Sequence, residues 1–459
     1  MAGGTYVTYN KNRPGAYINF KAIPKPLSNV GSRGVATMPM TMDWGPVGEV
    51  MEIYSEDLIT GKAQSKIGYT VYDDEAQMFR EVLKGCYKLL AFRVDTGGKQ
   101  ASATLGNLTV TAKYTGICGN KISVAILDDE TAEEDTNFIV VTYYNTLEKD
   151  RQNVTSISEL VDNDWVNFSG TGALSLTAGT MLSGGENGTV INDTYSTYMN
   201  TMKMHQWQVM GLPITENSNV RTNTVTYIKN LRENIGKKVQ LVLYNYSEAD
   251  YEAIISVDQG YKTSSETIGT AAFVATITGL TAGAEINESL TYYVIDGATE
   301  IINQRNDEQI ETAITTGKMV LSTRQDGVIV IEKDINTLHN FTIDKDYQFS
   351  KNRVIRTLDE IANSSQLTWE KSYIGKVDND EQGRKDYKAD LIYYFNELQR
   401  MRAIQNFDST EDIDVLPGNE VDEVIVKLII QPVDSMEKMY MTVMVGQKTS
   451  GYTVSSIAA

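Results

Sequence analysis

The chain has 459 residues, and 41 lysine and arginine residues against 60 aspartate and glutamate residues give it a formal net charge of −19. About three domains are expected at this length. The acidity disfavours nucleic-acid binding, because phosphate backbones are bound mainly by basic surface. We find neither an apolar run long enough to span a bilayer nor, in the first residues MAGGTYVTYN, a signal peptide. We therefore expect a soluble protein made in the cytoplasm, with no membrane insertion.

Residues 1–30 are predicted to form an extended arm. The first 42 residues contain five basic residues and no acidic one, and five of the eight prolines lie within the first 46 residues, where they discourage helix. Ala16, Ile18 and Phe20 alternate with other residues at the period of a strand with one buried face. So short a strand cannot form a sheet alone, and it needs an edge in its own chain or in another.

Residues 31–97 combine short strands with one amphipathic helix, residues 72–84, which ends before Gly85 in the position of a C-cap glycine. Its apolar face is Ala76, Phe79, Val82 and Leu83. Residues 98–181 show strand-like runs and nothing helical over three turns, so they are predicted to be an all-β module.

Residues 182–345 alternate helices with strands, which predicts a mostly parallel sheet covered by helices. The segment LSGGENGTV opens this part as a glycine-rich joint. Because residues 35–94 have the same character, we expect them to complete this α/β domain, with the β module inserted into it. The predicted helices are 194–203, 219–235, 270–283 and 307–316, and the predicted hairpin is 319–334.

Residues 346–446 are predicted to form a helix-plus-sheet domain. Two long helices, 347–369 and 381–405, precede two strands, 420–432 and 437–446. The first strand places Val424, Val426, Leu428 and Ile430 on one face. Residues 447–459 form a second arm, with Tyr452 and Val454 as alternate anchors.

Catalytic chemistry finds little support in the sequence. His205 and His339 have no companion ligands at a metal-site spacing, and no nucleotide-binding motif is present. The segment Met181 to Gly185 lacks the first glycine of a nucleophile elbow. Acidic clusters at 128–135 and 378–381 lack the spacing of a calcium loop and are interpreted as solvated loops. Cys86 and Cys118 are interpreted as reduced, partly buried thiols. We expect no enzyme activity, no metal and no cofactor.

Interface chemistry is more prominent, since the chain has 26 tyrosines and 17 methionines, and both residue types are enriched where proteins meet. Two arms suggest strand exchange between identical subunits, and a head-to-tail exchange that does not close gives a filament or tube. The residues alone favour this reading no more than the alternative in which both arms fold back on their own domain.

The run RPGAYINF, Arg13 to Phe20, resembles the arm of tail sheath proteins from contractile phage tails and phage-tail-like bacteriocins. The segments LSGGENG (182–188), AKYTG (112–116), GNKISV (119–124), NRVIR (352–356) and DEI (359–361) resemble corresponding segments of that family, in the same order. The resemblance implies a β-sandwich inserted into a non-catalytic, subtilisin-like α/β domain, followed by a C-terminal assembly domain, that is, a multidomain fold of α/β and α+β type with extended arms.

The resemblance also implies a function. The subunits would stack as hexameric rings around a tail tube in a virion tail or tail-like particle, assembled in the host cytoplasm, and the sheath would contract to drive the tube through a cell envelope. Expected partners are further copies of the chain and the tail tube, baseplate and tail terminator proteins. The arm residues expected to exchange strands are Arg13, Gly15, Tyr17, Ile18, Phe20, Tyr452 and Val454, and the expected acceptor sheet is Val424, Val426, Leu428 and Ile430.

Two other function classes are weighed against this one. A surface adhesin or receptor-binding protein is supported by the tyrosine-rich β module, although it fits poorly with the expected lack of a signal peptide. A hydrolase built on the α/β domain needs a nucleophile and a base, and the sequence does not point to either.

Overall fold

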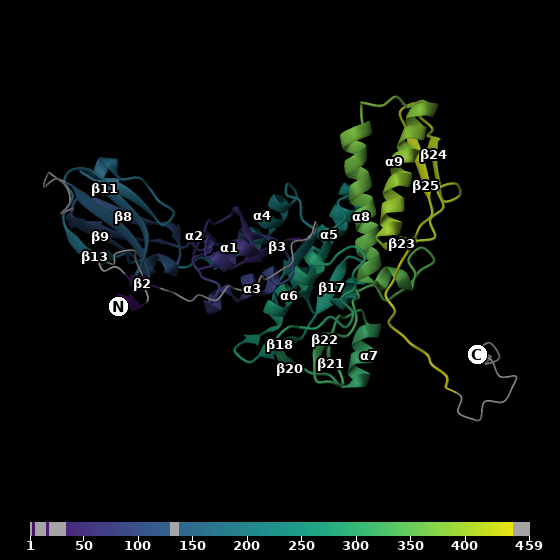
Figure 1. Ribbon diagram of the computed structural model, residues 1–459, viewed down its shortest axis with the longest axis horizontal. Helices are drawn as coiled ribbons and strands as arrows, with labels where there is room; N and C mark the ends of the chain where they lie inside the picture. Colours follow the sequence, from purple (N-terminus) through teal and green to yellow (C-terminus); the bar gives the residue numbers. More distant parts are fainter. Residues whose placement is uncertain (1, 5–14, 18–33, 129–136, 444–459) are drawn as a thin grey trace.

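The computed structural model describes residues 2–4, 15–17, 34–128 and 137–443 and arranges them as three parts in a row (Figure 1). A β-sandwich lies at one end and an α/β body in the middle. The long helices α8 (Asn352–Thr368) and α9 (Glu381–Arg400) stand side by side at the other end. This is the mixed multidomain fold that the sequence predicts, with a domain containing two long helices at its C-terminal side.

The α/β body is built on a six-stranded sheet in the order β17-β16-β15-β3-β5-β4, which is parallel except for β4 at one edge. Three of these strands precede the sandwich in the sequence and three follow it. The strands are β3 (Val35–Met40), β4 (Val50–Tyr54), β5 (Lys88–Arg93), β15 (Val209–Leu212), β16 (Gln240–Tyr244) and β17 (Ile254–Val257).

Alternating apolar residues give this sheet two buried faces. Val209 and Val242 lie in one core with the central helix α6 (Thr270–Gly283), while Met210 and Leu241 lie in a second core with α4 (Asn192–Met202) and α5 (Ser218–Asn230). Helices on both faces are the arrangement that a buried parallel sheet requires. α5 continues into a π-helical turn, Leu231–Ile235, so the helix predicted over 219–235 is found with an irregular last turn.

The helix predicted over 72–84 is a 3₁₀ turn (Asp74–Ala76) followed by α3 (Gln77–Leu83), and its four predicted apolar residues are buried. The role predicted for Gly85 as a helix cap is wrong, because Gly85 does not adopt a left-handed conformation. A Cβ atom at Gly85 would lie 2.3 Å from the backbone of Gly279, and one at Gly279 would lie 1.9 Å from the Val82 oxygen. Glycine is required here because α3 and α6 pack backbone to backbone.

The β-sandwich has a four-stranded sheet, β11-β10-β9-β13, and a three-stranded sheet, β12-β8-β7. Trp165 of the sandwich stacks on Trp44 of the α/β body with ring centroids 5.7 Å apart, and the Tyr144 hydroxyl donates to the Gly68 oxygen. These contacts hold the sandwich against the body. The strands are β7 (Gln100–Leu105), β8 (Leu108–Thr115), β9 (Ile122–Asp128), β10 (Phe138–Tyr144), β11 (Leu147–Val154), β12 (Val166–Gly170) and β13 (Thr177–Met181).

The other described elements are short. At the N-terminus β1 (Ala2–Gly4) pairs in parallel with β2 (Gly15–Tyr17). The predicted hairpin over 319–334 is present as β21 and β22, with its turn at Asp326 and Gly327. The elements are α1 (Ser55–Thr60), α2 (Gln64–Ile67), β6 (Asp95–Thr96), β14 (Thr189–Val190), β18 (Gly260–Thr263), β19 (Thr267–Ile268), β20 (Ala298–Ile302), α7 (Asp307–Thr315), β21 (Leu321–Thr323) and β22 (Ile329–Ile331).

The C-terminal domain places two small antiparallel sheets against α9. They are formed by β23 (Ile404–Gln405) with β26 (Gln431–Pro432), and by β24 (Ile413–Pro417) with β25 (Val424–Leu428). The predicted helix limits need correction at two ends. α8 begins at Asn352, since residues 347–350 form a separate 3₁₀ turn, and α9 ends at Arg400, since Ile404 and Gln405 already belong to a strand.

The strand predicted over 437–446 is wrong for the residues that the structure describes. Residues 437–443 have no strand pairing, and Met439, Tyr440 and Met441 are exposed by 82%, 91% and 70%. The chain runs away from the C-terminal domain at this point (Figure 1). Alternating apolar residues form a strand only where another strand pairs with them, and no partner is found in the described part of the chain.

Candidate assembly interface

The hairpin of β24 and β25 is held in place by its packing on α9. Ile413 and Val415 of β24 are buried in one apolar cluster with Leu391 and Phe395 of α9. Val424, Leu428 and Ile430 are partly buried against the same cluster. Two strands alone are marginally stable in water, so the helix supplies the apolar surface that keeps this hairpin formed.

The outer edge of β25 presents unpaired backbone groups. Gly418 N–H donates to Glu423 O at 2.9 Å and Ile429 N–H donates to Asp412 O at 2.8 Å. Antiparallel pairs alternate between residues that bond each other and residues whose N–H and C=O point away. Followed along the register from Ile413 opposite Leu428 to Pro417 opposite Val424, this alternation turns the backbone groups of Val424, Val426 and Leu428 outward. Within the described ranges no backbone group bonds them.

The edge of β24 is less suited to a further strand. The same alternation turns Ile413, Val415 and Pro417 outward on that side, and two of these three positions have no free N–H. Pro417 has no N–H, and the N–H of Val415 donates to the Asp414 carboxylate at 3.0 Å. Proline at an outward position is a common way in which proteins blunt a sheet edge. The hairpin therefore offers one open edge, on β25, and that edge is lined by apolar side chains.

Some of the predicted site residues lie within the described part of the chain and the others lie outside it. Val424, Val426 and Leu428 lie on β25, Val426 is 39% exposed, and Ile430 follows the strand. Gly15 and Tyr17 are the ends of β2. Arg13, Ile18, Phe20, Tyr452 and Val454 lie outside the described residues, so the contact between arms and acceptor edge stays a prediction.

Sequence reasoning missed two features of this region. The first is Pro417, since proline at the end of a strand is itself a sequence signal for an outward-facing edge position. The second feature is a buried ion pair, Lys351 with Glu437, which ties the segment after β26 to the start of α8. No pattern in the sequence identifies this pair, because its members are 86 residues apart.

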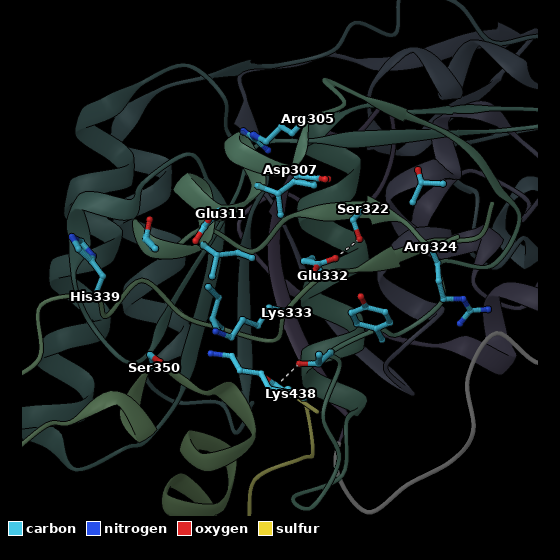
Figure 2. Close-up of a pocket in the computed structure, with 18 of the residues that line it drawn as sticks. Arg305, Asp307, Glu311, Ser322, Arg324, Glu332, Lys333, His339, Ser350 and Lys438 are labelled. Carbon is cyan, nitrogen blue, oxygen red and sulfur yellow. Dashed lines mark hydrogen bonds between the residues drawn. The ribbon is translucent and has the colours of Figure 1, made fainter. Parts of the chain in front are cut away.

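A hollow of about 1160 Å³ lies beside α7 and the β21–β22 hairpin (Figure 2). Its charged groups are mostly satisfied: Ser322 donates to Glu332, Arg324 pairs with Asp326 and Arg305 pairs with Asp258. No group of three or more potential metal ligands is found among the described residues.

The two histidines and the two cysteines occupy ordinary structural positions. His339 Nδ1 lies 2.8 Å from the Thr337 oxygen and 3.3 Å from Asp250, while the His205 carbonyl accepts from Lys237. Burial raises the pKa of Cys86 to about 12 and also raises the pKa of Cys118, so both thiols stay protonated at neutral pH. No described helix combines the length and the apolar composition that crossing a membrane demands.

Family models of phage tail sheath domains match consecutive segments of the chain. Residues 33–94 match the tail sheath protein Gp18 domain III N-terminal region, and residues 96–187 match the phage tail sheath protein beta-sandwich domain. Residues 188–337 match the phage tail sheath protein central domain, and residues 344–446 match the phage tail sheath C-terminal domain. The fold and its domain content thus define a structural protein of the contractile-sheath class.

The chain belongs to the phage tail sheath protein family. It is 32% identical over 473 residues to the phage-like element PBSX protein XkdK of Bacillus subtilis, a match that covers 96% of this chain and 99% of that protein. It is 39% identical to the crystal structure of a sheath tail protein from Desulfitobacterium hafniense, with a TM-score of 0.80 over 94% of this chain and 99% of that one. Tail sheath proteins are structural proteins, and membership of their family implies a non-enzymatic role.

The fold also extends to a contractile assembly. The contracted helical sheath of the anti-feeding prophage aligns with 95% of this chain and 100% of its own, at a TM-score of 0.56 and 10% identity. At that identity the similarity concerns the fold alone. The predicted membership of the sheath family is confirmed, whereas the subtilisin-like character of the central domain and the domain limits predicted from the sequence stay predictions.

Proposed function

We propose that the chain polymerises as stacked hexameric rings around a tail tube and contracts to drive that tube through a target cell envelope. The observation that carries this proposal is the open edge of β25, together with an exposed apolar segment that leaves the same domain without a partner. Strand addition from another copy would satisfy the outward groups of Val424, Val426 and Leu428 and bury the exposed methionines. Identical subunits joined in this head-to-tail way form an open lattice.

Contraction would draw on the same joints. Main-chain pairing between an arm and a sheet edge tolerates rotation of the two subunits when the linkers on either side absorb it. A lattice trapped in an extended state on the tube could then change to a state with more buried surface while its subunits stay connected. Each subunit needs to contribute only a few kcal/mol, because the contributions add along the lattice. Further partners in this proposal are the baseplate and tail terminator proteins, in a virion tail or tail-like particle assembled in the bacterial cytoplasm.

The N-terminal arm gives the first test of this function. Deleting residues 1–22 removes the predicted exchanging strand and leaves the described α/β body, sandwich and C-terminal domain intact. We expect a folded monomer from the deletion variant and hollow tubes from the full chain, compared by negative-stain electron microscopy and analytical ultracentrifugation. Normal tubes from the deletion variant would contradict arm exchange. Monomers from both proteins, even with tail tube added, would contradict the sheath lattice itself.

A further inference from the structure

The segment after β26 does not take the position that its sequence favours. Consecutive strands usually become neighbours in a sheet, so residues 438–443 would be expected to turn back and pair with the open edge of β25 in the same chain. The connection is short enough, since only nine residues separate Leu428 from Lys438. Instead residues 438–443 are unpaired and exposed. The residues that precede this segment, 433–437, which we call its root, must therefore be held away from the β25 edge of the same chain.

The root is fastened to the body along one face. The N–H of Val433 donates to the Ala403 oxygen at 3.0 Å, directly after β26 pairs with β23. Val433, Ser435 and Glu437 are half-buried, whereas Asp434, Met436 and Lys438 are exposed. This alternation is that of an extended segment lying on a surface, and it ends at Glu437, beyond which every described residue is exposed.

Glu437 makes the last and strongest of these attachments. Its carboxylate pairs with the ammonium of Lys351 and accepts a hydrogen bond from the Thr291 hydroxyl at 2.9 Å. The Glu437 side chain is 13% exposed and that of Lys351 is 3% exposed. Burial disfavours the charged form of Lys351, yet the hydrogen bond and the charge of Glu437 hold the pKa of this lysine above its ordinary value. Breaking the pair would leave a buried charge with a weaker partner, Asp434, at 3.5 Å.

The attachment is backed by a rigid network. The Thr291 hydroxyl also accepts from the N–H of Asp334 at 3.0 Å, and the Asp334 carboxylate accepts from Arg356 at 2.7 Å and from Asn352 at 2.8 Å. Asp334, Asn352 and Arg356 are buried at the point where α8 leaves the α/β body, and Thr291 is half-buried beside them. Glu437 is thus fixed to the junction of two domains, and Figure 2 shows the neighbouring Lys438 beside the hollow that lies there.

We propose that Lys351, Thr291 and Glu437 form a positioning clamp that keeps the C-terminal segment from capping the β25 edge of its own chain. The clamp leaves the β25 edge free for a strand from a second copy of the chain. It also directs residues 438–443 outward, toward the β25 edge of a further copy. This inference rests on the proposed function, because it assumes that the edge and the segment meet between subunits. What it adds is a role for the ion pair between Lys351 and Glu437: this pair favours strand pairing between chains over strand pairing within one chain.

The test uses the full chain with Glu437→Gln and, separately, Lys351→Met. Each variant breaks the clamp from one side; Glu437→Gln keeps the size of the side chain, and Lys351→Met keeps an unbranched chain that is one atom shorter. Glu381→Gln is the matched control, because Glu381 pairs with Lys385 in the same domain but both side chains are largely exposed. Hydrogen exchange at single-amide resolution, measured on dilute monomer, reports the amides of Val424, Val426 and Leu428. Tube formation is followed by light scattering and electron microscopy.

We expect these three amides to exchange rapidly in wild type and in Glu381→Gln, and to slow by about tenfold or more in both clamp variants, as expected for newly paired edge amides. The clamp variants should form fewer tubes, and the double variant should behave like either single one, because the two residues act as a unit. A merely structural role would lower the stability without protecting β25.

Two results would overturn the clamp. One is tube formation and β25 exchange equal to wild type in both variants. The other is a loss of tubes while the three amides still exchange rapidly. The failure of the underlying function looks different: wild type then forms no tubes under any condition, and the exchange of the monomer alone decides whether the clamp exists.

Discussion

Proline at position 426 separates the two kinds of backbone pairing that β25 can make. The N–H of Val426 points away from β24, so Val426→Pro removes a group that the hairpin does not use. The side chain is 39% exposed, and little packing is lost with it. An added strand, in contrast, would lose its central donor and would meet the proline ring. The variant should fold normally and assemble poorly.

The expected size of the effect follows from the edge geometry. Val424, Val426 and Leu428 each offer one N–H and one C=O, and each hydrogen bond contributes about 1 kcal/mol net. The proline deletes one bond and leaves the facing carbonyl of the arriving strand without a donor, which costs about 1–2 kcal/mol more. A total of about 2–3 kcal/mol corresponds to a roughly 30- to 150-fold weaker joint. The critical concentration for tube formation should rise by a similar factor or more.

Light scattering over a concentration series measures that critical concentration. Val426→Thr is the control, since it keeps the N–H and a β-branched side chain at the same place. Ile425→Pro is the opposite control, because the N–H of residue 425 pairs with β24, and its loss should lower the stability of the monomer itself. The reasoning is refuted if Val426→Pro forms tubes at the wild-type concentration while its unfolding curve is unchanged.

Two further predictions concern the α/β body. Gly279→Ala places a Cβ atom 1.9 Å from the Val82 oxygen, so it should lower the free energy of unfolding by about 3 kcal/mol or more. Gly269→Ala is the control, because its Cβ atom meets no atom within 4 Å, and it should lower the same quantity by less than about 1 kcal/mol. Urea unfolding of both variants measures the difference. Burial lowers the pKa of Lys237 to about 8, so the unfolded chain binds more protons between that pH and about 10.4, and stability should rise with pH across this window. Lys237→Met should flatten that rise by about 1 kcal/mol, since solvent contact reduces the full effect; equal pH profiles of the two proteins would contradict the assignment.

Much of the fold could be predicted because the relevant signals are local. The apolar face of α3 follows from helical spacing, and α6 spans the predicted residues 270–283. The alternation of strands with helices predicted a mostly parallel sheet, which the structure contains. Strand β11 carries no comparable signal, because LEKDRQNV is almost wholly polar. This strand pairs at the edge of its sheet, where a strand can form without an apolar face of its own.

The failed expectations have tertiary causes. Gly85 has the position of a helix cap in the sequence, but glycine is required there because the backbone of Gly279, almost 200 residues further on, leaves no room for a Cβ atom. The predicted glycine-rich joint also makes contacts that its composition does not show, since Gly185 exchanges two hydrogen bonds with Asn120 and Lys99 N–H donates to the Glu186 oxygen. Local composition cannot reveal either contact.

We interpret the C-terminal hairpin, β24 with β25, as part of a larger sheet that a single chain does not complete. Its inner face is buried on α9, one edge is blunted by Pro417, and the other edge carries outward amides and apolar side chains. A protein that functioned as a monomer would be expected to protect both edges, because an open apolar edge invites association. In the proposed function this asymmetry gives the hairpin a direction, because the added strand pairs with β25 and the proline of β24 opposes pairing on the other side. A directional joint of this kind, repeated between identical chains, produces an ordered lattice in place of random aggregation.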